Sequence, residues 1–134
     1  EVKTVNEELV ISTEEVANRI DNSNFVMIDT RSTAEHTGDK ILGGADRGGH
    51  IPNAVHIEWN KTLKADKTLK SGAALKKLYE SHGVTPNKEI SMHCHTAVRS
   101  AHTFFVLRLI GYPVLRNYDA SWVGWANDSS LPVE

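Results

Sequence analysis

The sequence predicts an α/β domain with a mainly parallel sheet of about five strands and with helices on both faces of the sheet. Short apolar runs without polar alternation, as in strands buried on both faces, recur along the chain. Segments with helical periodicity lie between these runs. The length of 134 residues suits one domain, and no Pro/Gly/Ser-rich linker divides the chain. We therefore expect a single domain over residues 1–134, in which residues 1–7 are loosely held.

Five short segments are the candidate strands. They lie at residues 9–11, 25–28, 54–57, 90–93 and 114–118. The run at 25–28 is continuous and has polar flanks, which is typical of a strand buried on both faces.

Three helices are expected between the strands. Ser12 and Glu15 have the spacing of a capping box, which predicts a helix from there to about residue 20. A second helix is expected at about 72–82, with apolar residues on one face. A third, at 98–110, is apolar around much of its circumference, so we expect it to be well buried.

Composition and charge exclude several classes of protein. With 15 Lys and Arg against 17 Asp and Glu, the net charge is −2, which offers no field for nucleic acid or an anionic membrane. The longest apolar runs have four residues, far below the ~20 that span a bilayer. No N-terminal signal peptide is recognised, so we expect a cytoplasmic protein, or a periplasmic one after signal removal. The single cysteine, Cys94, excludes an internal disulfide and a multi-cysteine zinc site.

Polar side chains follow two of the predicted strands. Asp-Thr-Arg at 29–31 comes after one of them, and His-Cys-His at 93–95 ends another. Ligands of parallel sheets bind beyond the carboxyl ends of the strands, so both segments should lie at a functional edge. Residues 32–53 contain five glycines and show no periodicity, and we expect a long loop there.

Cys94 is the candidate nucleophile. It stands between a buried strand and a helix that begins near Arg99, where unpaired backbone N–H groups and the helix dipole favour an anion. A nearby guanidinium also favours the thiolate over the thiol. A lone cysteine is more often a small core residue, but a core cysteine is rarely found at such a turn. In a strand, His93 and His95 would face away from Cys94, so no metal site is expected.

Four segments resemble, in the same order, motifs of the rhodanese (sulfurtransferase) family. Cys94 and Arg99 enclose four residues, as in that family's active loop, whereas cysteine phosphatases enclose five and admit phosphate. The other segments are Ile-Asp-Thr-Arg at 28–31, Gly-His-Ile-Pro-Asn-Ala at 49–54 and Tyr-Asp-Ala-Ser-Trp at 118–122. The chain looks most like the catalytic, C-terminal module of tandem-domain thiosulfate sulfurtransferases. The resemblance implies a rhodanese-like three-layer fold and, if the chain is a fragment, a second rhodanese domain as partner.

The resemblance implies a sulfurtransferase of the thiosulfate:cyanide type. The Cys94 thiolate would take the outer sulfur of a thiosulfate-like donor, and the resulting persulfide would pass it to cyanide, a thiol or a protein. This is a double displacement that needs no metal and no organic cofactor. One alternative is a 3-mercaptopyruvate sulfurtransferase, although the Gly-Ser-Gly that follows the cysteine in that group is absent here. The other alternative is a binding or sensing module without turnover.

The resemblance also implies roles for the residues around Cys94. Asp29, Glu35 and His50 are expected to support the site, with His50 bound to Asp29 or to a loop carbonyl. Arg99 either holds an anionic donor or forms an ion pair with Asp29 or Glu35, and Arg31 has the same two possible roles. The expected substrate-binding residues are His95, Thr96, Ala97, Val98, Arg99, Arg31 and Trp122.

Several residues depart from the family pattern, among them Ala97, Asn53 and Glu35. Ala97 and Asn53 stand where the family often has glycine, and asparagine tolerates a positive φ better than most residues. Glu35 stands where thiosulfate enzymes of the animal type have a second substrate-binding arginine. An unpaired carboxylate at that position would repel a dianionic donor.

Overall fold

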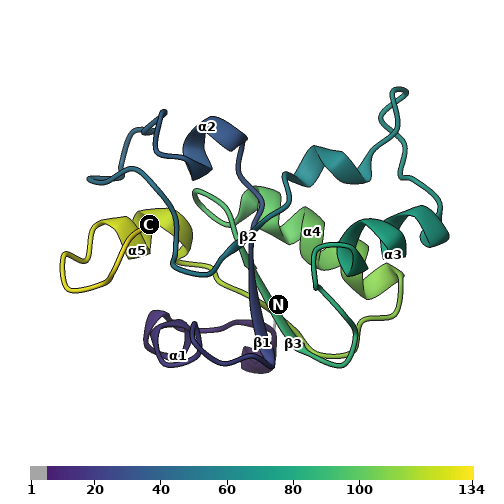
Figure 1. Ribbon diagram of the computed structural model, residues 1–134, viewed down its shortest axis with the longest axis horizontal. Helices are drawn as coiled ribbons and strands as arrows, with labels where there is room; N and C mark the ends of the chain where they lie inside the picture. The colour runs from purple at the N-terminus through teal and green to yellow at the C-terminus, as the bar shows by residue number, and fades with distance from the viewer. Residues whose placement is uncertain (1–5) are drawn as a thin grey trace, which may run out of the picture.

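A parallel four-stranded sheet lies at the centre of the domain in the computed structural model, which describes residues 6–134 (Figure 1). The strands are β1 (Phe25–Asp29), β2 (Val55–His56), β3 (Glu89–His93) and β4 (Leu115–Asn117). Their order in the sheet is β2-β1-β3-β4, and every adjacent pair is parallel. The predicted α/β class with a parallel sheet is confirmed.

Helices cover both faces of this sheet, with α1 and α5 on one side and α3 and α4 on the other (Figure 1). None of the helices that the structure describes has the length and hydrophobicity that crossing a bilayer requires. The helical segments are η1 (Glu7–Leu9), α1 (Thr13–Ala17), α2 (Thr33–His36), η2 (Trp59–Thr62), α3 (Gly72–Glu80), α4 (Val98–Leu109) and α5 (Ser121–Ala126).

Successive side chains of β1 point to opposite faces of the sheet and so belong to two separate core clusters. Val26 and Ile28 face α3 and α4, in a cluster that also contains Leu107. Phe25 and Met27 face the opposite side and pack with residues of α1 and α5. The continuous apolar run of this strand therefore reflects burial on both faces, as predicted.

The N-terminal segment differs from the prediction. The expected strand at 9–11 is reduced to one isolated bridge between Val10 and Asn117, so the sheet has four strands rather than about five. A longer strand is prevented because the capping box of α1 begins directly afterwards. The expected looseness of residues 1–7 falls mainly on residues 1–5, which lie outside the described part of the chain.

The segment at 32–53 is not entirely a loop, because it contains α2. Ser32 caps this helix and Glu35 returns the bond to the backbone of Ser32, in a second capping box. A helix of four residues is too short to show a periodic pattern, which is why periodicity does not predict it. The rest of the segment crosses to the C-terminus, where His50 and Glu134 exchange backbone hydrogen bonds of 2.7 and 3.0 Å.

Helix α4 is less buried than predicted. Its side chains Val98, Phe105 and Leu109 are 76, 58 and 61% exposed. Only one side of the helix packs on the sheet, and that side includes two hydroxyl residues besides two aliphatic ones. Several apolar residues lie on the side of the helix that faces away from the sheet, so the expectation of a well-buried helix is wrong.

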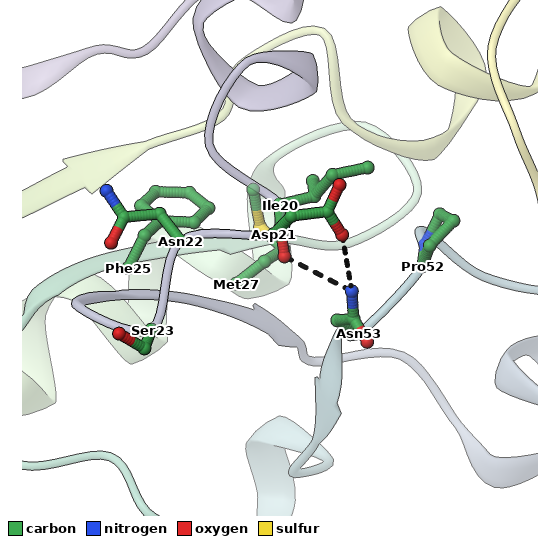
Figure 2. A pocket seen from close by; sticks show the side chains of 8 residues that line it. All are labelled: Ile20, Asp21, Asn22, Ser23, Phe25, Met27, Pro52 and Asn53. Carbon is green, nitrogen blue, oxygen red and sulfur yellow. Dashed lines mark hydrogen bonds between the residues drawn. The ribbon is translucent and has the colours of Figure 1, made fainter.

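A cavity of about 290 Å³ opens between the turn after α1 and residues 52–53 (Figure 2). At its edge the Asn53 side-chain amide donates 3.2 Å hydrogen bonds to the Ile20 carbonyl and to Asp21. Asn53 has a φ of +62°, in agreement with its place at a position where glycine is common. Phe25 and Met27 line the cavity, which therefore lies beside the amino-terminal half of β1 and away from the carboxyl edge of the sheet.

Gly49→Ala is expected to destabilise the fold by about 2 kcal/mol. Gly49 has a φ of +99°, and a Cβ there would overlap the Glu134 carbonyl oxygen and lie 2.8 Å from Val133 Cγ1. Gly43→Ala is the control, because no atom lies within 4 Å of a Cβ at that position. Urea unfolding of both variants measures the difference, and equal midpoints would contradict this account of Gly49.

Candidate active site

The two predicted edge segments lie side by side. Asp29 ends β1 in register with His93, which ends β3. Thr30 then donates two hydrogen bonds to the His93 carbonyl, from its amide at 3.0 Å and from its hydroxyl at 2.9 Å. Cys94 follows at the carboxyl edge of the sheet with 1% of its surface exposed. The thiol therefore lies at the base of the loop that leads into α4.

The carbonyl groups of this loop are bound by α5. The amide of Trp122 donates to the Cys94 carbonyl at 3.0 Å, and the amide of Val123 donates to the His95 carbonyl at 3.2 Å. The amides in the first turn of a helix have no acceptor within the helix, so α5 can use them to fix the loop. The His93 ring adds a third bond, from Nδ1 to the Cys94 carbonyl at 3.0 Å.

Two amides of the loop donate to a side chain of α5, and the others have no acceptor in the described chain. The Ser121 hydroxyl accepts from the amides of Cys94 and Ala97, at 3.3 and 3.0 Å. Ala97 has a φ of +64°, which turns the chain into α4 at a position where the family often has glycine. Four further amides have no acceptor in the part of the chain that the structure describes: those of His95 and Thr96, and those of Val98 and Arg99, which lie in the first turn of α4. They are available to an anion next to Cys94.

Arg99 pairs with Glu35 through both terminal nitrogens of its guanidinium, at 2.8 and 2.7 Å. Burial alone would raise the pKa of Glu35, but its hydrogen bonds to Arg99 and Ser32 lower it to about 2. The pKa of Arg99 is raised, first by the hydrogen bonds to Glu35 and also by the Cys94 sulfur. The pair joins α2 to the loop, and its two opposite charges compensate each other beside the thiol.

Arg31 is buried, with 1% of its surface exposed, and binds Asp29. Its Nε and one terminal nitrogen donate to the Asp29 carboxylate at 2.6 to 3.1 Å, and that nitrogen also donates to the Gly49 carbonyl at 2.8 Å. Burial opposes the charge of Asp29, yet His93, His36 and Arg31 hold its pKa below the usual range. The guanidinium also lies 4.4 Å from the ring centre of Trp122, so it connects β1 with α5.

The remaining predicted residues surround the loop. Trp122 is 2% exposed and donates from its ring nitrogen to the Arg47 carbonyl at 3.1 Å. His95 donates from Nε2 to the Gly43 carbonyl at 3.0 Å, which holds its ring against the glycine-rich segment. Thr96 and Val98 are exposed at the surface of the loop.

A stack of imidazole rings lies next to Asp29. His36 donates to Asp29 at 2.9 Å, and its ring lies 3.9 Å from that of His50 and 4.5 Å from that of His56. His50 donates to the His36 carbonyl at 3.0 Å, so it is bound to a carbonyl of the 32–53 segment rather than to Asp29. The pKa of His50 is lowered, first by burial and then by the charge of His36. No sequence pattern indicated His36 or His56 as neighbours of the site.

His93 is fully buried and has one ring nitrogen without a partner. That nitrogen, Nε2, lies 3.8 Å from Asp29 Oδ1 and makes no hydrogen bond within the described residues. Because His93 faces Asp29 and His95 faces Gly43, the two rings do not meet around Cys94. Among residues 6–134, no group of three or more His, Cys, Asp and Glu side chains has an arrangement suited to a metal ion.

Ser121 contacts the loop, although no sequence pattern predicts an individual role for it. It belongs to the Tyr-Asp-Ala-Ser-Trp segment at 118–122, which resembles a motif of the family and contains the predicted substrate-binding residue Trp122. Its φ of +51° and its hydroxyl contacts with two loop amides depend on the folded backbone. A local pattern could therefore indicate the segment but not the contact.

Comparison with known families agrees with this geometry. The family model described as Rhodanese-like domain matches residues 12–128 of the chain. The chain belongs to the rhodanese-like domain family.

Curated relatives of this rhodanese-like chain include a sulfur carrier protein and thiosulfate sulfurtransferases. The sulfur carrier protein TtuD of Thermus thermophilus is 43% identical over 114 residues, which are 80% of this chain and 40% of that protein. A thiosulfate sulfurtransferase of Pseudomonas aeruginosa is 33% identical over 131 residues, which are 98% of this chain and 48% of that enzyme. The chain thus spans less than half the length of these relatives.

Solved structures share the fold of this rhodanese-like chain. The anaerobic ergothioneine biosynthesis enzyme from Chlorobium limicola, in complex with trimethyl histidine, superposes with a TM-score of 0.86 at 23% sequence identity. The match covers 95% of this chain and 32% of that enzyme. At this level of identity, the similarity concerns the architecture of the domain.

Glu35→Gln is expected to increase the reactivity of Cys94 toward iodoacetate relative to iodoacetamide by about fivefold. The substitution removes the negative charge that compensates Arg99, and a unit charge about 4 Å away is worth about 1 kcal/mol even in a water-like dielectric. The anionic and neutral reagents differ in charge, so their rate ratio reports the local potential. Glu14→Gln, on the exposed part of α1, is the matched control. An unchanged ratio would show that Glu35 does not influence the charge near the thiol.

The free energy of unfolding is expected to decrease as the pH is lowered from 7 to 4.5. Burial lowers the pKa of His93 to about 4, so His93 is neutral when folded but binds a proton in the unfolded chain, where its pKa is about 6.5. The contribution of neutral His93 to the free energy of unfolding is complete above pH 6.5 and is progressively lost as the pH falls toward 4. Burial also lowers the pKa values of His50 and His102. Urea unfolding at several pH values should give a smaller slope for His93→Gln, and identical slopes would contradict the assignment.

Proposed function

We propose that this domain is a sulfurtransferase in which Cys94 carries a sulfane sulfur as a persulfide. The loop geometry is the main support, since Cys94 stands beside loop amides that have no other acceptor in the described chain. Thiosulfate sulfurtransferases that are 33 and 34% identical over 98% of the chain give independent support.

The proposed reaction is a double displacement. The Cys94 thiolate attacks the outer sulfur of thiosulfate, the S–S bond of the donor breaks, and sulfite leaves with the bonding electron pair. An acceptor nucleophile then attacks the outer sulfur of the Cys94 persulfide and restores the thiolate. With cyanide the product is thiocyanate, and with a thiol it is a new persulfide. The loop amides stabilise the anionic sulfur in both steps, and the chemistry requires no metal or organic cofactor.

The two arginines act in this proposal as braces rather than as anion receptors. Arg99 has both terminal nitrogens on Glu35, and Arg31 is buried on Asp29. Neither guanidinium therefore offers an uncompensated charge to a dianionic donor. Binding of the donor then depends on the amides of the loop, and His95 keeps the adjoining segment in place through Gly43.

A protein acceptor is a second candidate for the final step, alongside small nucleophiles. The observation that favours it is the 43% identity with a protein named as a sulfur carrier. Thr96 and Val98 are exposed on the loop and would be the first residues that an incoming acceptor meets. The persulfide mechanism at Cys94 is the same for either acceptor.

Incubation with thiosulfate is expected to add one sulfur atom to the wild-type chain, detected by intact mass, and cyanide should remove it. Cys94→Ser should gain no sulfur and should lose transfer activity by about 10³-fold or more, because it lacks the thiolate. The chain has a single cysteine, so the added sulfur has one possible thiol carrier.

Mercaptopyruvate and a protein persulfide are tested as donors in parallel. Loading from mercaptopyruvate alone would indicate the 3-mercaptopyruvate sulfurtransferase alternative. If no donor loads the folded wild-type chain, the proposed sulfurtransferase function is wrong and a binding or sensing module replaces it.

A further inference from the structure

One hydroxyl group connects three segments at the base of the loop. Ser121 Oγ accepts from the amides of Cys94 and Ala97 and donates to the Tyr118 carbonyl at 2.9 Å. A serine hydroxyl has one donor and two acceptor positions, so these bonds use its full capacity. The side chain is completely buried, and water has no access to replace any of the three bonds.

The backbone of Ser121 is held in a conformation that serine rarely adopts. Its φ is +51°, in the left-handed region that glycine enters without a steric penalty. If this position had to supply only the turn into α5, glycine would fit it better. The presence of a fully bonded serine therefore indicates that the hydroxyl has a role of its own.

That role follows from which backbone amides and carbonyls of the loop are hydrogen-bonded to α5. Ser121 takes the amides of Cys94 and Ala97, and the next residues of α5 take the carbonyls of Cys94 and His95. Both ends of the short segment between Cys94 and Ala97 are thus fixed to one point on α5. The chain between them has to curve, and the amides that remain unclaimed are those assigned above to the sulfur.

We propose that Ser121 is the positioning residue of the sulfur-transfer reaction: its hydroxyl holds the loop from Cys94 to Ala97 in the curve that presents the free amides to the reacting sulfur. The proposal rests on the proposed sulfurtransferase function. Ser121 does not touch the donor. It acts through the loop, and its loss should change the reactivity of Cys94 more than the stability of the fold.

Two substitutions distinguish the effect of the Ser121 hydroxyl from the effect of its backbone conformation. Ser121→Gly removes the hydroxyl and also relieves the positive φ, so we expect a melting temperature within about 5 °C of wild type. Ser121→Ala removes the hydroxyl and keeps the unfavourable backbone. Ser91→Ala is the matched control, because Ser91 is a buried serine of β3 whose hydroxyl has no partner within the described chain.

Three readouts are measured on the folded variants. Both Ser121 variants should load sulfur from thiosulfate about tenfold more slowly, as expected for the loss of two amide hydrogen bonds. The pH at which alkylation of Cys94 by iodoacetamide reaches half its maximal rate should rise by about one unit, since fewer amides stabilise the thiolate. Amide hydrogen exchange at Cys94 and Ala97 should accelerate. Ser91→Ala should match wild type in all three.

Wild-type values of loading, alkylation and exchange in Ser121→Gly would overturn the proposal, and Ser121 would then be a packing residue. Failure of both Ser121 variants to fold would also overturn it, because the hydroxyl would then be required by the whole domain rather than by the loop alone. If the wild-type chain does not accept sulfur, the proposed function fails separately. The alkylation profile and the hydrogen exchange still decide whether Ser121 positions the loop.

Discussion

The buried carboxylate of Asp29 is the group on which the geometry of the site depends. An ionised carboxylate inside a protein costs several kcal/mol unless hydrogen bonds and opposite charges offset the loss of water. Here the Arg31 guanidinium supplies both, and the His36 ring adds a further hydrogen bond. Arg31 in turn binds the Gly49 carbonyl and lies against Trp122 of α5, the helix that holds the loop of Cys94. A single charge at the end of β1 thus determines where three separate segments meet.

The compensation of charge around Cys94 has a consequence for the chemistry. Both neighbouring guanidinium groups are occupied by carboxylates, so the site has little net charge to attract an anion. Backbone amides remain as the groups that stabilise negative sulfur. Fixed dipoles of this kind need no reorganisation when charge develops, which makes them effective in a site from which water is largely excluded. Stabilisation of the negative sulfur then depends more on the precise conformation of the loop backbone than on the number of cationic side chains nearby.

The sequence predicted those parts of the structure that depend on local patterns. The apolar run at 25–28, the capping box at Ser12 and the spacing of Cys94 and Arg99 each describe a short stretch of chain, and the structure contains the corresponding elements. Helix α2 was missed because four residues carry no periodicity, and the burial of α4 was overestimated because apolar content does not reveal which side packs. The contacts of Ser121 join residues 24 and 27 positions apart, and no local signal encodes them.

Two residues with unfavourable backbone conformations meet at the same loop. Ala97 has a φ of +64° and Ser121 a φ of +51°, and each costs of order 1–3 kcal/mol relative to an unstrained residue. Such strain persists only where surrounding bonds determine the conformation, and here a hydrogen bond of 3.0 Å joins the two residues directly. The free-energy cost of the curved loop conformation is therefore offset by the contacts that form when the domain folds. A loop organised in this way does not have to be ordered again when the sulfur arrives, which is the physical advantage of building the site on α4 and α5 rather than on a flexible segment.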